Sequence, residues 1–169
     1  MINLFSKFNS RSRMECFSKT DGRMRGIFPV MGTISIGDLD LEILEGLGGH
    51  TWGQIYLYSV KEGLLFAADS VINFSSLTKE RADYSSLAAF LVTSVNVDSD
   101  LAKKERMALL EIAYQTDLKL APKGKRCLIC GGHGAVSVLE NDRLITYGNI
   151  ERYLPHQQCT HGGEGKEPG

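Results

Sequence analysis

The sequence predicts an α/β protein with a mixed β-sheet, and three observations lead to this. Short runs of β-forming residues alternate with glycine-containing turns over residues 30–68, and the pattern returns over residues 126–147. The segment between them repeats apolar residues at helical spacing. The 169 residues are 43% hydrophobic and 23% charged, which is typical of a globular domain with a packed core.

The first strands are predicted from alternation and turn chemistry. Residues 30–36 and 39–44 flank Gly37-Asp38, which predicts a hairpin. Residues 55–60 are rich in β-formers, so a third strand is expected there. Residues 64–68 form a short continuous apolar run, as in a strand that is buried on both faces.

Two helices are predicted next, over residues 78–94 and 99–115, with Ser99 as the N-cap of the second. Residues 126–130 then read as another short buried strand. Extended segments are expected at 135–139 and 144–147, joined by a turn or a short helix.

The domain organisation follows from these elements. We expect an irregular leader at residues 1–26, one domain at 27–153 and a disordered tail at 154–169. The formal net charge of -1 gives no nucleic-acid signal. No apolar run is long enough for a membrane-spanning helix, and the four cysteines do not suggest a disulfide framework, so we expect a cytoplasmic protein without a membrane partner.

Three polar residues stand where predicted strands give way to loops. His50 lies in a glycine-rich loop, Asp69 ends the run 64–68, and His133 lies in a second glycine-rich loop. Two imidazoles and a carboxylate are a common ligand set for Zn²⁺ or non-haem iron. If the strands are adjacent or parallel, the three side chains would lie at one edge of the sheet.

Three segments in order resemble the metallo-β-lactamase-fold hydrolases: His50-Thr51-Trp52-Gly53, Gly63-Leu64-Leu65-Phe66-Ala67-Ala68-Asp69-Ser70 and Cys130-Gly131-Gly132-His133-Gly134. The resemblance covers residues 30–140, although the family pattern has glycine where Ala68 stands. It implies a mixed-sheet half of a metallo-β-lactamase-type αβ/βα sandwich, here with two inserted helices.

The resemblance also implies a chemistry. Asp69 would bridge two metals, with His50 and His133 as further ligands. The metals would be zinc, or alternatively iron or manganese, and a metal-bound water would be the nucleophile. Substrates in this superfamily are small-molecule esters, thioesters, lactams or phosphodiesters.

The chain departs from the family in one important respect. The signature His-x-His-x-Asp-His should precede the first loop, but no histidine occurs before His50. We therefore expect a partial or truncated hydrolase with an incomplete metal site. The alternative is a non-catalytic half-domain or relic that acts, if at all, through a partner. A homodimer or a partner chain could cover the sheet face that a half sandwich leaves open.

Other features have competing interpretations. Trp52 could line a substrate pocket or pack its loop onto the sheet. Cys127 and Cys130 form a C-x-x-C that is either part of a buried strand or, with the His/Cys tail, a small zinc module. The charged run 103–106 is expected to be a solvated helix face. Ser70 and Asn73 are candidates for orienting Asp69.

Overall fold

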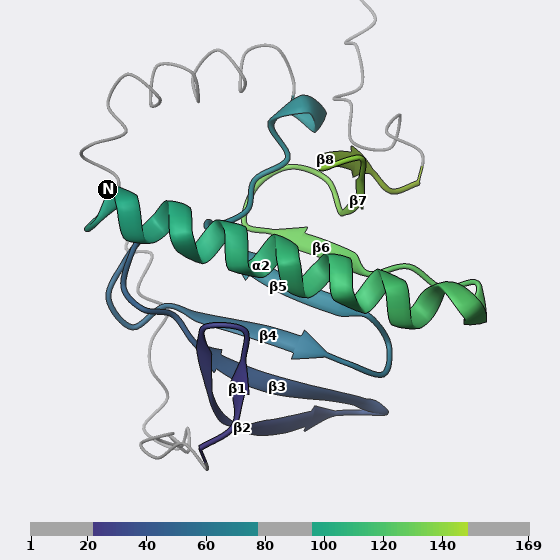
Figure 1. The fold of residues 1–169 in the computed structure, drawn as a ribbon, viewed down its shortest axis with the longest axis horizontal. Coiled ribbons are helices and arrows are strands. Elements are labelled where there is room, and N and C mark those ends of the chain that lie inside the picture. The colour runs from purple at the N-terminus through teal and green to yellow at the C-terminus, as the bar shows by residue number, and fades with distance from the viewer. Residues whose placement is uncertain (1–21, 78–95, 149–169) are drawn as a thin grey trace, which may run out of the picture.

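The computed structural model describes residues 22–77 and 96–148, and these form a mixed α/β unit (Figure 1). Within these residues there is one eight-stranded sheet, one α-helix and two 3-10 helices. The strands are β1 (Met24–Arg25), β2 (Phe28–Ile36), β3 (Leu39–Glu45), β4 (Ile55–Ser59), β5 (Leu64–Ala68), β6 (Leu128–Gly131), β7 (Ser137–Glu140) and β8 (Arg143–Thr146). The helices are η1 (Phe74–Ser76), α2 (Ser99–Leu120) and η2 (Ala121–Lys123).

The strands follow one another across the sheet in chain order. Every neighbouring pair is antiparallel except β5 and β6, which are parallel. A parallel pair needs a crossover connection, and the segment that contains α2 provides it. The predicted strands at 30–36, 39–44, 55–60, 64–68 and 126–130 are therefore confirmed to within two residues or so at their ends.

The connection between β7 and β8 is a tight turn. Asn141 and Asp142 have φ angles of 48° and 61°, so both central residues are left-handed, as in a type I′ hairpin turn. This settles the alternative between a turn and a short helix in favour of the turn. At the other end of the sheet, β1 lies within the region that we treated as a leader and pairs with the start of β2.

The helix α2 differs from its prediction at both ends. Its N-cap is Asp98, whose carboxylate accepts the N–H of Leu101, so the proposed Ser99 cap was wrong by one residue. The helix continues to Leu120, five residues beyond its expected end, and stops where Pro122 and left-handed Gly124 follow. The other predicted helix, 78–94, lies outside the described residues.

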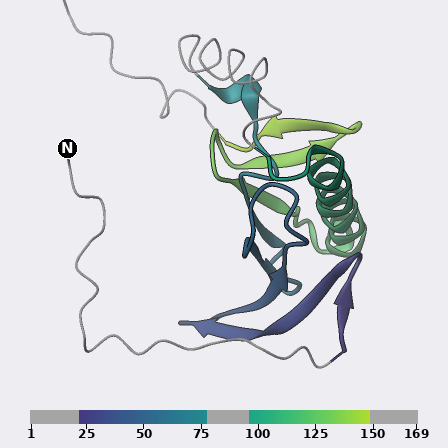
Figure 2. The same cartoon turned by 90° about the vertical axis from the view of Figure 1, so that its left-hand side faces the viewer.

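The core lies between α2 and one face of the sheet, as Figure 2 shows with the helix seen end-on. Tyr56 and Leu65 from the sheet meet Leu109 and Ala113 from the helix, and all four are buried. Tyr58 is fixed to the same helix by a 2.6 Å hydrogen bond between its hydroxyl and Thr116. The opposite face of the sheet is mixed. Leu41 and Ile43 are buried there, whereas the following side chains are exposed: Ile34, Ile36, Ile55 and Phe66.

In the described part of the chain, no helix combines the length and the apolar character that crossing a bilayer demands.

Candidate metal site

The strand directions bring three loops to one edge of the sheet. The parallel strands β5 and β6 end side by side, which places Asp69 next to the loop that carries His133. The pair Glu45↔Ile55 puts the connection between β3 and β4, with His50, at this same edge. The shared edge that the sequence led us to expect is therefore present.

The side chains of these loops converge on a single carboxylate. Nε2 of His50 lies 3.6 Å from Oδ2 of Asp69, and Nε2 of His133 lies 3.5 Å from Oδ1 of the same residue. Each imidazole thus faces a different oxygen. The His50 side chain is 17% exposed, whereas Asp69 and His133 are 41% and 65% exposed, so the site opens to solvent on the His133 side.

These separations are too long for hydrogen bonds, which place nitrogen and oxygen about 2.7–3.2 Å apart. They match the distance between two ligands of one cation. Ligand atoms about 2.0–2.2 Å from a tetrahedral zinc ion lie about 3.3–3.5 Å from each other. Separations of this length also occur in histidine–carboxylate ion pairs, so the distances are compatible both with such pairs and with two cation positions that share the Asp69 carboxylate.

Asn96 determines which nitrogen of His50 is available. Its Oδ1 lies 2.8 Å from Nδ1 of His50, and because this oxygen only accepts, the hydrogen bond requires the proton on Nδ1. Nε2 is then the nitrogen that faces the Asp69 carboxylate. It can bind a cation when the ring is neutral, or donate a hydrogen to the carboxylate when the ring carries a second proton.

A buried carboxylate holds the loop that carries His50. Glu105 of α2 is 1% exposed and accepts the backbone N–H groups of Leu47 at 2.5 Å and Gly49 at 2.9 Å. The start of the helix adds backbone bonds from Val97 to the carbonyl of His50 and from Asp98 to that of Gly49. Our expectation that residues 103–106 form a solvated face was wrong for Glu105.

Glycines permit the close approach of the other two loops. A Cβ on Gly132 would lie 1.8 Å from Oδ1 of Asp69, and a Cβ on Gly131 would lie 2.2 Å from the carbonyl oxygen of Val71. The N–H of Gly132 donates to the carbonyl of Ala68 at 2.7 Å. The backbone before His133 is thus packed directly on the backbone around Asp69.

Ser70 and Asn73 shape the Asp69 loop instead of touching its carboxylate. The Ser70 hydroxyl is hydrogen-bonded to Gln54 and to Tyr56, each at 2.8 Å. Burial raises the pKa of Tyr56 to about 12, so its hydroxyl keeps its proton at neutral pH. Asn73 donates to Ser137 at 2.8 Å and ties the loop to β7. The structure shows no direct orienting bond from Ser70 or Asn73 to Asp69.

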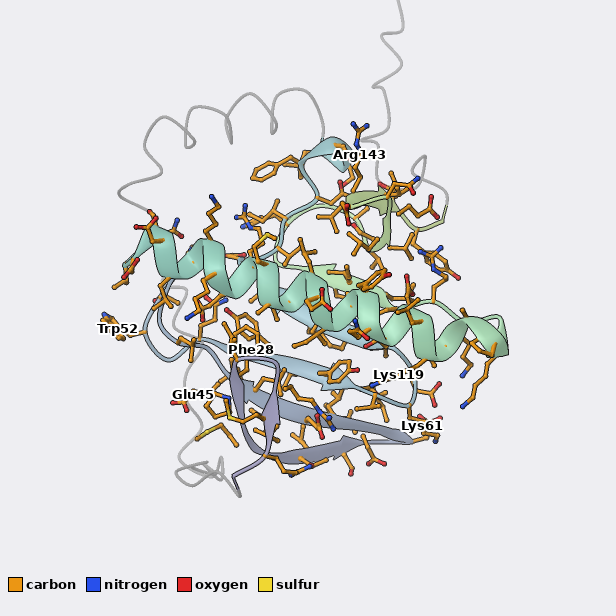
Figure 3. The ribbon with its side chains drawn as sticks, viewed as in Figure 1. Phe28, Glu45, Trp52, Lys61, Lys119 and Arg143 are labelled. Carbon is orange, nitrogen blue, oxygen red and sulfur yellow. The ribbon has the colours of Figure 1, made fainter. Side chains whose placement is uncertain are left out.

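Trp52 does not line an enclosed pocket. The residue is 75% exposed and lies at the end of the molecule beyond the start of α2 (Figure 3). Its ring packs over Gly48, where an added Cβ would lie 2.8 Å from Cε3. The structure therefore places Trp52 against its own loop and not on the sheet, and its part in a substrate site stays a prediction.

The C-x-x-C pair is part of the strand structure. Cys127 is 1% exposed in the core under α2, and burial raises the pKa of its thiol to about 12. Cys130 pairs with Phe66, whose side chain points to the opposite face of the sheet. Because side chains alternate along a strand, the two thiols lie on opposite faces and cannot ligate one ion together. The tail that would complete such a zinc module lies outside the described residues.

Comparison with protein-family models, with curated proteins and with solved structures finds no match to this chain. Within residues 22–77 and 96–148, no group of three or more His, Cys, Asp or Glu side chains gathers around one point as a complete cation site. This agrees with the distances above, since each prospective position has one imidazole and one carboxylate oxygen.

Proposed function

We propose that this chain is the metal-binding half of a dinuclear hydrolase of the metallo-β-lactamase type. The observation that supports the proposal is the pair of separations from Asp69, 3.6 Å to His50 and 3.5 Å to His133, on different oxygens. Asp69 would bridge two divalent cations, zinc being the best match to this donor set, with iron or manganese as alternatives. Bound cations of this kind polarise a substrate and lower the pKa of a water molecule.

The chain's own residues would hold and orient these cations. Asn96 fixes the tautomer of His50, while Glu105 fixes the position of its loop. Esters, thioesters, lactams and phosphodiesters are the substrate classes that the resemblance implies. Two ligands for each cation are fewer than the three that catalytic zinc sites take from the protein, so activity would require ligands from another chain or segment.

The second candidate function is a non-catalytic half-domain that works through a partner. The same shortage of ligands favours it, together with the exposed apolar side chains on the sheet face away from α2, among them Ile36 and Phe66. Under either proposed function, we expect a partner protein or a second copy of this chain to cover this face.

Metal stoichiometry tests the proposal. Three proteins are purified and equilibrated with Zn²⁺. They are the full chain, a His50→Ala/His133→Ala double variant, and a tail variant in which serine replaces His156, Cys159 and His161. Bound metal is then quantified by elemental mass spectrometry. We expect zinc to bind to the full chain and to the tail variant but not to the double variant. Zinc that is lost only from the tail variant would contradict the proposal and identify the tail as the binding segment.

A further inference from the structure

Arg106 presents a positive charge beside the loop of Asp69 and has no acidic partner within residues 22–77 and 96–148. Its Nε donates to the backbone carbonyl of Ser70 at 2.9 Å, and Ser70 directly follows Asp69. In the described part of the chain, its two terminal nitrogens have no hydrogen bond or ion pair to protein. The guanidinium is thus anchored through one donor while four N–H groups stay available.

The position of Arg106 on α2 explains why it reaches the loop that follows Asp69. The neighbouring Glu105 points into the core and accepts a hydrogen bond from the His50 loop. The helix α2 therefore lies along the edge where the loops meet. Lys103 precedes Arg106 by three residues and therefore lies on the same flank of the helix. It is exposed and likewise has no acidic partner among the described residues. Arg106 therefore borders the loop of Asp69, and Lys103 adds a second positive charge on the same flank of the helix.

A free guanidinium fork is best suited to a tetrahedral or planar oxyanion. Arginine binds phosphate and carboxylate through two parallel N–H bonds. Of the four substrate classes above, only a phosphodiester carries negative charge on the group that reacts. An oxyanion with one oxygen toward Asp69 and its metal positions and another toward Arg106 would use both features of this edge.

We propose that Arg106 is the specificity-determining residue of this site and selects a phosphodiester as substrate. This inference rests on the proposed metal-binding function. Arg106 would bind a non-bridging phosphate oxygen through its terminal N–H groups while Nε keeps its bond to Ser70. Lys103 would add long-range attraction for the anion without fixing its orientation.

The test uses the zinc-loaded full chain and dimethyl phosphate, a stable phosphodiester anion, with acetate as the competing oxyanion. Binding is followed by NMR through the Nε–Hε resonance of Arg106 and the backbone amides of the site. We expect dimethyl phosphate to shift the Arg106 resonance, and Arg106→Gln to weaken its binding about tenfold, as the loss of a charge-assisted hydrogen bond predicts. Arg106→Lys should recover only part of this loss.

Lys119→Gln is the matched control, because it removes one positive charge at the far end of the same helix (Figure 3). It should change the affinity less than twofold. Equal effects of Arg106→Gln and Lys119→Gln, with zinc still bound, would overturn the role of Arg106 and leave the metal proposal intact. Acetate binding as tightly as dimethyl phosphate would overturn the choice of a phosphodiester. Absence of zinc from the wild-type chain would overturn both proposals together.

Discussion

The carboxylate of Glu105 accepts a 2.9 Å hydrogen bond from the N–H of Gly49, the residue that precedes His50. The helix and the loop are in contact so close that a Cβ on Gly49 would lie 2.3 Å from the backbone nitrogen of Ala102. The loop therefore has one position relative to α2. Because Asn96 comes just before the same helix, both the loop of His50 and its ring are set by α2.

Replacing Glu105 should destabilise the protein and release the His50 loop from α2. Glu105→Ala leaves the N–H groups of Leu47 and Gly49 without their acceptor, and each unsatisfied buried donor costs about 1–3 kcal/mol. We expect a loss of about 3 kcal/mol in the free energy of unfolding, measured with urea, together with loss of zinc. Glu105→Gln keeps one acceptor oxygen for the two N–H groups, so one of them stays unsatisfied and the variant should lose about 1–3 kcal/mol. The exposed neighbour Lys104→Ala is the control and should change stability by less than about 0.5 kcal/mol.

Gly132 offers a way to disturb the site while the fold survives. A methyl group there would meet Oδ1 of Asp69, the end of a side chain that can rotate away at little cost. Gly132→Ala should therefore lower the free energy of unfolding by less than about 1 kcal/mol and still abolish zinc binding, because the bridging carboxylate is displaced.

The adjacent glycine supplies the contrasting variant. A methyl group on Gly131 would meet the carbonyl oxygen of Val71, which is backbone and cannot rotate aside. Gly131→Ala should thus destabilise the protein by about 1–3 kcal/mol, as overpacking does. If Gly132→Ala binds zinc as the wild type does, Asp69 is not the bridging ligand.

The buried thiol of Cys127 makes stability depend on pH in the alkaline range. Its pKa is raised from 9.0 to about 12 in the folded protein, because burial disfavours the thiolate. Between these values the unfolded chain releases this proton and the folded chain keeps it, so stability is present below pH 9 and falls as the pH rises toward 12. From pH 8 to pH 10 the wild type should lose about 1 kcal/mol more than Cys127→Ala. Urea unfolding under reducing conditions at both pH values measures the difference, and parallel losses in the two proteins would show that Cys127 is not responsible.

The three ligand candidates could be found from the sequence because the residues around each one carry a local signal. His50, Asp69 and His133 follow strand-like segments, and glycines surround both histidines. Such local signals predict that polar side chains meet at a sheet edge. They cannot supply the number of ligands at each cation position, because that depends on distances between loops.

The residues that hold the site could not be found in this way. Glu105 contacts Leu47 across 58 positions in the chain, and Asn96 contacts His50 across 46. Glu105 also stands in a run of charged residues, which suggests a solvated face. Its place in the buried helical stripe with Ala102 and Leu109 was the one available sign that it points inward. A charge that is buried on such a stripe requires a hydrogen-bond partner. The partners here are the N–H groups of Leu47 and Gly49, which only the fold brings next to Glu105.

Ala68, at the end of β5, occupies a backbone position that favours glycine. Its φ angle is +45°, in the left-handed region that residues with a Cβ adopt at a cost of about 1–2 kcal/mol. Glycine removes this strain but loses about 0.5–1 kcal/mol through greater freedom of the unfolded chain. Ala68→Gly should therefore raise the free energy of unfolding by about 0.5–1 kcal/mol. The neighbour Ala67, which is fully buried in the core, provides the control, since Ala67→Gly has no such strain to relieve and should destabilise. A destabilised Ala68→Gly variant would mean that the contacts of the Ala68 methyl group outweigh its backbone strain, and the turn into Asp69 would then be maintained by side-chain packing.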